Sequence, residues 1–326
     1  LPADARLFPR AIQPRAQLGA WLPSTQVVTD IDDTVKSSGG LTLAGIPLGG
    51  VDASYARGVF YPGVFQFGLE LACSQRLVGQ TPPKMAILTA RAKELKWALQ
   101  ISPSSSLCVR YAQAGASKKL SDWGVGPVLY GSLEEWVCQD RKGWRKADNF
   151  RILQASAPRK RRYVFIGDNG ASERDFEAAE RIVRAAPGAL RAVFLHAVSP
   201  TEQLAPLPAD ERLGGVPILY FRTYAAAAAK AVQHRLFSAR AMHRVLDAVE
   251  ADMADMAADA LGSANEQLLL DELADARALA RPVAGRPAAA ISRWLKRRKP
   301  VSRAASGIGR GGDLERLTSS VAKDRT

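Results

Sequence analysis

Cysteine and histidine are scarce in this sequence. The chain of 326 residues has three cysteines, Cys73, Cys108 and Cys138, which are widely spaced and odd in number. A disulfide framework is not expected from such a set, and a reducing, cytoplasmic compartment is favoured. No cysteine pair has metal-ligand spacing, and the three histidines are scattered along the chain. The sequence therefore gives no support to a zinc site.

Long apolar runs are also missing. Hydrophobic residues make up 47% of the chain, which is ample for a core, but no run approaches the length needed to cross a bilayer. We therefore do not expect an integral membrane protein. Because the first residue is Leu1 and not Met, we expect a fragment or a processed form, in which an N-terminal targeting signal would not be visible.

The positive charge is concentrated at one end of the chain. The net charge is +13, and residues 281–326 hold twelve Lys or Arg against three Asp or Glu, which is +9 and leaves +4 for the rest. This last stretch is rich in Arg, Ala, Gly, Pro and Ser, so we expect a disordered tail. Its segment "ISRWLKRRKPVSR" could contact an anionic membrane, although a solvated tail is the favoured interpretation and no nucleic-acid binding is predicted.

Short apolar runs alternate with helical patterns over most of the chain. The runs are continuous, as in strands buried on both faces of a parallel sheet, and lie at 26–30, 84–90, 126–132, 161–168, 190–198 and 216–221. Helices are expected at 63–78, 91–99, 145–156, 173–186 and 223–237. The alternation predicts a doubly wound α/β fold, which binds ligands at the carboxyl ends of its strands.

Four segments are expected in this order. Residues 1–24 form a loosely structured lead-in, 25–237 form the α/β domain, 238–280 form a helical extension, and 281–326 form the basic tail. Within the α/β domain, the glycine-rich residues 39–61 are expected to form a small flap or hairpin, and not a full lid.

The stretch "VVTDIDDTVKSSGG" places three aspartates after the first strand candidate. Asp30 ends the strand, Asp32 follows in the turn, and Asp33 comes next. Core packing does not explain these carboxylates, because a buried unpaired charge is costly, whereas a bound divalent cation does explain them. The alternative is a turn in which the carboxylates accept backbone N–H bonds, and this alternative is favoured for Asp33.

Other strand ends carry polar groups as well. "MAILTAR" places Thr89 and then Arg91 at a strand end, although Thr89 alone would be better explained as a helix N-cap. "YVFIGDNGASERDFE" ends its strand in Gly167-Asp168, with Glu173 and Asp175 downstream as alternative acids. "RKADNFRIL" puts Lys146 at the start of a helix, where a lysine is more often solvated.

Taken in order, these pieces (DxDxT, Thr, Lys, GD and a later Asp) resemble the haloacid dehalogenase superfamily of phosphohydrolases over residues 25–237. "DIDDTVKSS", "YPGVFQFGLELA", "YVFIGDNG" and "YFRTYAAAAAKAVQHRL" are similar to the phosphatidate phosphatase family first known from a yeast actin-patch-associated protein. Here Thr89 stands where that family usually has a serine, and His196 stands where it tends to have an arginine.

The resemblance implies a Mg²⁺-dependent phosphomonoesterase with phosphatidate as its substrate. It assigns Asp30 as nucleophile and Asp32 as general acid and base, with Thr89 and Lys146 binding the transferring phosphoryl group. The metal would be held by Asp30, the backbone carbonyl of Asp32, Asp168 and Asp175. Substrate contacts are assigned to Thr34, Lys36, Arg91 and Asn169. Two alternatives are a phosphatase for a phosphoprotein or small metabolite, and a non-catalytic scaffold on the same fold.

Overall fold

The computed structural model describes residues 24–43, 46–47, 50–74, 76, 80–92, 101–132, 141–157, 161–170, 174–199, 201, 206–257 and 259–279. The expected lead-in (apart from Ser24), the basic tail and Glu173 lie outside these residues.

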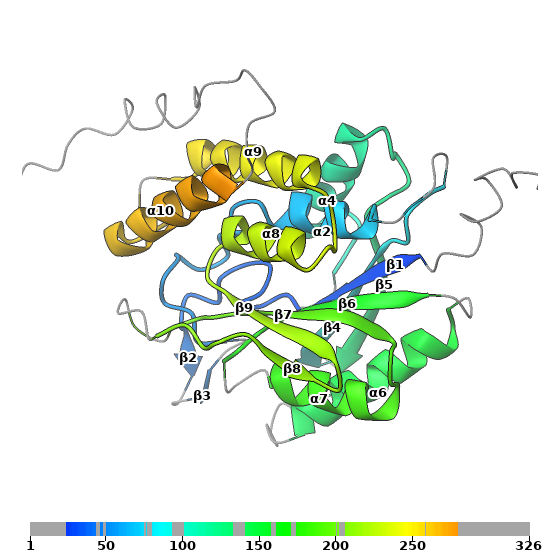
Figure 1. Cartoon of the computed structure of the whole chain (residues 1–326). Helices are drawn as coiled ribbons and strands as arrows, with labels where there is room; N and C mark the ends of the chain where they lie inside the picture. The colour runs from blue at the N-terminus through cyan, green and yellow to red at the C-terminus, as the bar shows by residue number, and fades with distance from the viewer. Residues whose placement is uncertain are drawn as a thin grey trace, which may run out of the picture.

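A mostly parallel sheet of seven strands forms the centre of the molecule (Figure 1). Each neighbouring pair is parallel except β8 and β9 at one edge, which are antiparallel. In spatial order the strands are β5 (Val125–Gly131), β4 (Met85–Ala92), β1 (Thr25–Thr29), β6 (Arg162–Asp168), β7 (Leu190–His196), β9 (Val216–Phe221) and β8 (Glu211–Leu213).

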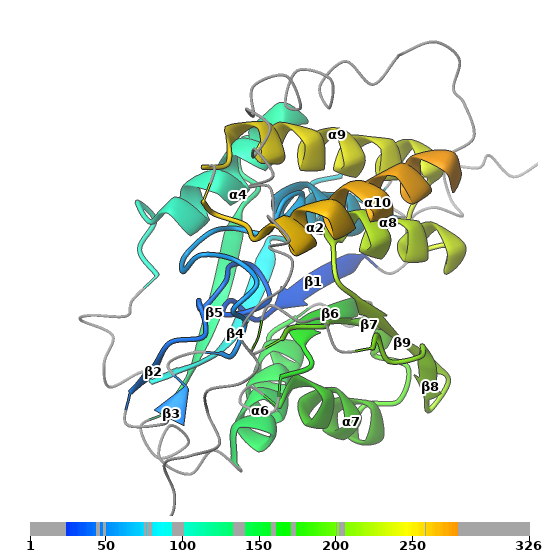
Figure 2. The same ribbon diagram turned by 90° about the vertical axis from the view of Figure 1, so that its left-hand side faces the viewer.

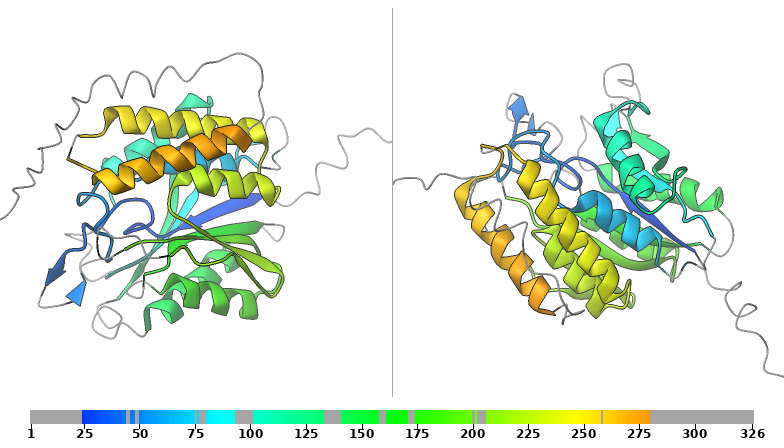
Figure 3. Two further views of the ribbon diagram at one scale, coloured as in Figure 1. Left: turned by 60° about the vertical axis from the view of Figure 1, so that its left-hand side comes forward. Right: turned by 90° about the horizontal axis from the view of Figure 1, so that it is seen from above.

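Helices cover both faces of the sheet. One face carries α2 (Val64–Ala72), α4 (Ser106–Ser117) and α8 (Tyr224–Gln233), and the other carries α6 (Lys142–Ala155) and α7 (Asp175–Ala185) (Figure 2). Two longer helices, α9 (Ala239–Asp255) and α10 (Ser263–Leu279), pack on α8 and form an outer layer (Figure 3). The expected α/β architecture is therefore confirmed, with α9 and α10 as a fourth layer on one side.

Two hydrophobic clusters hold these layers together. Along β1, Val27 joins the cluster under α2, α8 and α9, whereas Val28 joins the cluster under α6 and α7. In the neighbouring strand β6, Val164 and Phe165 divide in the same way. Because successive strand residues point to opposite faces, a sheet covered on both sides needs continuous apolar runs.

Some elements differ from the sequence expectation. Strand β4 continues to Ala92, so Thr89 lies inside a strand and is not the N-cap of a helix at 91–99, whose remaining residues are not described. Helix α6 begins at Lys142, three residues earlier than expected, and its first turn holds Trp144 under the Arg181 guanidinium at 3.3 Å. That contact comes from α7, so no local pattern could reveal it.

Two short or weakly patterned elements were not expected at all. Helix α4 buries a narrow stripe of Leu107, Tyr111 and Gly115, and its mean hydrophobic character is low. Its start is capped by Ser105, whose hydroxyl accepts the Cys108 N–H at 3.3 Å. Strand β8 is three residues long and largely exposed at the sheet edge. Because so little of it is buried, its sequence has no apolar run that would predict a strand.

Strand β1 occupies the point at which the chain reverses its direction of growth across the sheet. β4 and β5 lie on one side of β1, and β6, β7 and β9 lie on the other. Thr29 is in register with Ile87 of β4 and Ile166 of β6. The residues just beyond this level are therefore brought to one edge of the sheet, at the crevice where such folds bind ligands.

After β1, the chain forms a short antiparallel pair of strands, β2 (Thr42–Leu43) and β3 (Ile46–Pro47). The loop after β1 is tied to the segment beyond this pair by Asp33, which adopts a left-handed backbone with φ of 57°. Its carboxylate accepts N–H groups from Ser38 at 2.8 Å, Asp52 at 2.8 Å, and Val51. Asp33 thus bonds backbone, as expected, but mostly at a distance along the chain.

None of the helices in the described ranges is long and apolar enough to cross a membrane.

Asp33 should make stability depend on pH. Burial raises the pKa of Asp33 from 3.8 to about 6. The folded chain therefore holds this proton more tightly than the unfolded chain. As a result, the free energy of unfolding falls as the pH rises from 3.8 to about 6, between the two pKa values. The total change is about 3 kcal/mol. We expect the stability of Asp33→Asn relative to wild type to rise over the same window, as measured by urea unfolding at a series of pH values. A difference that stays constant with pH would contradict this account.

Candidate functional site

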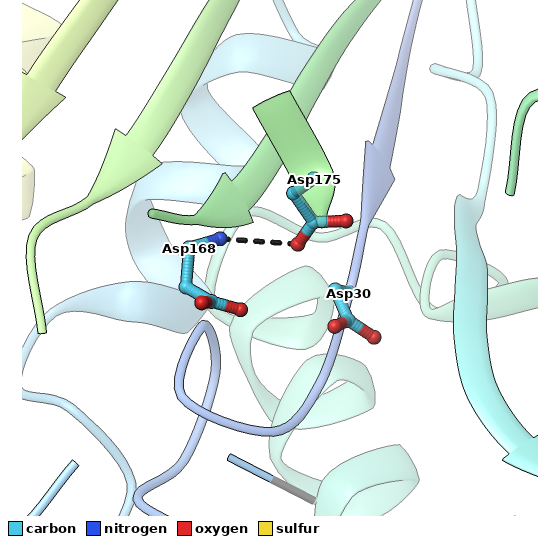
Figure 4. A group of neighbouring side chains, drawn as sticks. All are labelled: Asp30, Asp168 and Asp175. Carbon is cyan, nitrogen blue, oxygen red and sulfur yellow. Dashed lines mark hydrogen bonds between the residues drawn. The ribbon is translucent and has the colours of Figure 1, made fainter. Parts of the chain in front are cut away.

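Three carboxylates meet at the carboxyl edge of the sheet (Figure 4). Asp30 follows β1, Asp168 is the last residue of β6, and Asp175 is the first residue of α7. One carboxylate oxygen from each lies within 4.8 Å of the others, and no residue of the three is more than 1% exposed. Two neighbouring strands and one helix therefore place three negative charges in a buried space.

The glycines of "GDNG" are needed for this approach. A Cβ atom on Gly167 would lie 2.4 Å from a carboxylate oxygen of Asp175, and one on Gly170 would lie 2.7 Å from a carboxylate oxygen of Asp168. The backbone also orients both acids, since Gly170 N donates to Asp168 Oδ1 at 2.6 Å and Asp168 N donates to Asp175 Oδ2 at 3.1 Å. Any larger residue at either glycine would displace a carboxylate.

Lys146 enters the same space from α6. Its Nζ donates to Asp30 Oδ2 at 2.9 Å and to Asp175 Oδ1 at 2.6 Å, and the side chain is 1% exposed. Lys146 lies in the second turn of α6, because the helix starts earlier than expected. The interpretation of Lys146 as a solvated surface lysine is therefore wrong.

The charges of these four groups suit a divalent cation. Three carboxylates against one ammonium leave an excess of negative charge in a site that water scarcely reaches. Buried charge is tolerated when it is neutralised, and carboxylate oxygens are ligands that hard cations such as Mg²⁺ prefer. The cluster could hold a metal ion, and its residues fit one.

Asp32 and Arg91 form an ion pair beside the cluster. Arg91 Nε donates to Asp32 Oδ2 at 3.0 Å, and Nη2 donates to Asp32 Oδ1 at 2.8 Å. The carboxylate of Asp32 is thus not among the three clustered acids. The Arg91 and Asp32 side chains are 21% and 15% exposed, whereas Asp30 is 1% exposed. The ion pair is therefore more accessible to solvent than Asp30.

Thr89 lies near the same edge. It is in β4 next to β1, two residues beyond the level at which Ile87 pairs with Thr29, and its hydroxyl accepts the Arg91 N–H at 3.2 Å. Thr89 and Arg91 are therefore placed on one short stretch of strand. Their spacing was visible in the sequence, but the ion pair of Arg91 with Asp32 was not.

The remaining residues assigned to substrate contacts, Thr34, Lys36 and Asn169, differ in their burial and in their bonds. Thr34 is completely buried, and its hydroxyl has no hydrogen-bond partner among the described residues. Lys36 is half-buried, and burial, reinforced by the nearby Arg91 charge, lowers the pKa of its ammonium. The side-chain oxygen of Asn169 accepts the Val198 N–H at 3.1 Å, which gives Asn169 a structural contact.

The loop that follows Asp30 is held by hydrogen bonds from residues to which the sequence motifs gave no such role. The His196 ring nitrogens lie 2.7 Å from the Asp33 carbonyl oxygen and 2.9 Å from that of Arg222. The Tyr224 hydroxyl donates to the Thr34 carbonyl at 2.7 Å. The end of β7 and the start of α8 therefore fix the loop that follows Asp30. Only tertiary structure shows these contacts, because the partners are far apart in sequence.

Comparison of the chain with protein-family models, with curated proteins and with solved structures finds no match. What the site could do is therefore inferred from its geometry and from the sequence motifs.

Lys146→Met should reveal how much the acidic cluster depends on the Lys146 ammonium. The variant leaves three buried carboxylates with too little positive charge, so we expect a loss of about 3–5 kcal/mol in the free energy of unfolding with EDTA present. Added Mg²⁺ should restore part of this loss. The measurement is denaturant unfolding of the purified full chain.

Arg151→Met is the matched control on the same helix. Arg151 pairs with Asp148 through side chains that are 69% and 57% exposed, so we expect a loss below about 1 kcal/mol. If the two variants lost equal stability, Lys146 would have no special part in holding the cluster.

Proposed function

We propose that the chain is a divalent-metal-dependent phosphomonoesterase that works through an aspartyl-phosphate intermediate. The proposal depends above all on one observation: the Asp30 carboxylate, which follows strand β1, contacts Lys146 and lies beside Asp168 and Asp175. This arrangement offers a nucleophile, a metal site and a cation for phosphoryl oxygens within one space. The resemblance of the motifs to those of phosphohydrolases supports the same function.

Asp30, Asp168 and Asp175 would hold the metal, and we propose Mg²⁺ because the donors are carboxylate oxygens. When bound, the ion would offset the negative charge of the phosphoryl group and of the clustered acids. Lys146 lies at 2.6–2.9 Å from two of these acids and would keep the Asp30 carboxylate turned toward the substrate.

In the first step, an Asp30 carboxylate oxygen attacks phosphorus, and the bond from phosphorus to the leaving oxygen breaks. The leaving oxygen takes a proton from Asp32, so that an alcohol departs and an acyl phosphate remains on Asp30. Lys146 and the Thr89 hydroxyl would donate to the phosphoryl oxygens as the charge on them develops.

In the second step, Asp32 removes a proton from water, and the water oxygen attacks phosphorus. The bond between phosphorus and the Asp30 oxygen breaks, which regenerates the carboxylate and releases inorganic phosphate. Both roles of Asp32 require that its carboxylate be released from Arg91, which holds both of its oxygens. An incoming phosphoryl group offers Arg91 an alternative anion of matching fork geometry.

For the substrate we propose phosphatidate, on the strength of the motif resemblance. The short β2–β3 pair is compatible with a bulky substrate, since it is far smaller than a lid domain. Phosphoproteins and small phosphorylated metabolites are the alternatives that a direct assay separates, and a non-catalytic scaffold is the outcome if nothing is hydrolysed.

Phosphate release from phosphatidate in mixed micelles tests this proposal. We expect release that needs Mg²⁺, stops with EDTA, and falls at least about a thousandfold in Asp30→Asn, because the variant has no nucleophile. Asp148→Asn is the control, since Asp148 is an exposed acid on α6 that pairs with Arg151 and is not one of the clustered acids.

Two other outcomes have distinct meanings. If an aryl phosphate is cleaved in the same Asp30-dependent way while phosphatidate is untouched, the mechanism stands and the lipid substrate is wrong. If neither ester is cleaved with Mg²⁺ present, the phosphomonoesterase proposal fails.

Arg91→Ala tests the exchange of partners at Asp32. If Arg91 moves from Asp32 to the phosphoryl group, its loss should raise KM by roughly tenfold, through the loss of a charge-assisted hydrogen bond. Arg91→Lys should recover only part of this, because an ammonium does not reproduce the fork of a guanidinium. An unchanged KM in Arg91→Ala would show that Arg91 does not contact the substrate.

A further inference from the structure

A cavity of about 390 Å³ lies away from the acidic cluster. It is lined by the end of α2 and the residues after it, by Lys118 at the end of α4, and by the turn between α8 and α9. These helices lie on the same face of the sheet (Figures 2 and 3). The volume is in the range of cavities that bind small molecules.

Positive charge dominates the lining. Arg76, Lys118, Arg235 and Arg244 face a single carboxylate, that of Glu70. Four cations gathered from three separate segments around one acid leave a net positive charge, which a further anion would offset. The excess of positive charge is the first sign of a binding site.

Glu70 does not account for this gathering. Its carboxylate, in a side chain that is 2% exposed, receives Lys118 Nζ at 2.6 Å and two nitrogens of Arg244 at 2.7 Å each. Gln66 Nε2 adds a fourth donor at 2.6 Å. The acid is therefore saturated by two cations, and its one negative charge offsets only one of them.

The other two cations have no acidic partner in the described part of the chain. Arg76 Nη1 donates to the carbonyl oxygen of Gln80 at 2.8 Å, which is a neutral acceptor. The exposed guanidinium of Arg235 has no hydrogen bond or ion pair with the described residues. Both groups retain donors that an anion in the cavity could use.

The first turn of α9 adds to the same field. Ser238 is the N-cap of this 17-residue helix, and Ser238 and Ala241 both line the cavity. A helix N-terminus favours a nearby negative charge, so the dipole of α9 and the four side chains act in the same sense. Leu236 and Phe237 supply apolar lining beside these groups.

The cavity lies at the amino end of the strands. Arg191, near the start of β7, donates to Thr25 at the start of β1 at 2.7 Å and to Ser74 of the cavity lining at 3.1 Å. Asp30 lies at the other end of β1, and five residues of strand span about 17 Å. An anion in the cavity would therefore not occupy the space around Asp30.

We propose that this cavity is a second anion site, which binds a small phosphate-bearing ligand independently of the acidic cluster. Arg235 and Arg76 supply the free donors, Lys118 and Arg244 supply the field, and the phosphate group lies toward the start of α9. The phosphate can come from a soluble molecule or from a phosphomonoester lipid headgroup, which share this chemistry.

Cys73 provides a reporter for this site that does not involve catalysis. It is a free, half-buried thiol in the cavity lining, and Cys108, also free and half-buried, is not part of the lining. The experiment uses the full chain and follows alkylation of Cys73 and of Cys108 by mass spectrometry, with EDTA present. The probes are inorganic phosphate, glycerol 3-phosphate, and phosphatidylcholine vesicles with or without phosphatidate, each against potassium chloride of equal ionic strength.

We expect at least one phosphate probe to slow alkylation of Cys73 saturably while Cys108 reacts as before. Arg235→Gln should raise the half-saturating concentration by roughly tenfold, through the loss of charge-assisted hydrogen bonds. Arg240→Gln, an exposed residue in the first turn of α9 outside the lining, should leave it unchanged. Protection by the soluble probes would assign a soluble ligand, and protection only by phosphatidate vesicles would assign a lipid headgroup.

Equal alkylation of Cys73 with every probe and with chloride would overturn the proposal, as would equal weakening in the two arginine variants. If Cys73 is unreactive, the phosphate-induced rise in the thermal unfolding midpoint decides. That rise should be smaller in Arg235→Gln than in Arg240→Gln, and equal rises would overturn the proposal. None of these readouts depends on hydrolysis, so a failure here is separate from a failure of the proposed phosphatase activity.

Discussion

The structure of the site depends on one ammonium group held among buried carboxylates. Lys146 approaches Asp30 and Asp175 to within hydrogen-bonding distance, in a region that solvent scarcely reaches. Such charges are tolerable only when each finds a partner, so α6, α7 and β1 must all keep their relative positions. With Asp168 included, three carboxylates set against the Lys146 ammonium still leave an excess of negative charge. This excess of negative charge favours the binding of a divalent cation.

The sheet supplies this arrangement through its topology. β1 lies between β4 and β6, so the end of β1 is flanked by two strand ends that carry polar residues. The second ring of contacts comes from elsewhere in the chain, where Tyr224 at the start of α8 and His196 at the end of β7 bond the loop after Asp30. Packing of α9 and α10 on α8 extends the support outward.

The two ends of the sheet differ in charge. Carboxylates gather at the carboxyl end, whereas the cavity at the amino end is lined by Arg76, Lys118, Arg235 and Arg244 around Glu70. A parallel sheet makes this separation possible, because its strand ends of one kind all lie at one edge. One domain can therefore present a cation site and an anion site about one strand length apart, with little electrostatic interference between them.

The sequence by itself determined the layers and two members of the acidic cluster, Asp30 and Asp168. Continuous apolar runs require strands covered on both faces, and an aspartate after such a run has no role in packing, so Asp30 and Asp168 could be identified without coordinates. Only the tertiary structure decided that Lys146 is buried, that Arg91 holds Asp32, and that α4 is a helix. The physical reason is the range of the interactions. The apolar pattern of a strand or a helix is set within a few neighbouring residues, whereas the partner of a charged side chain is fixed by contacts between segments far apart in the chain.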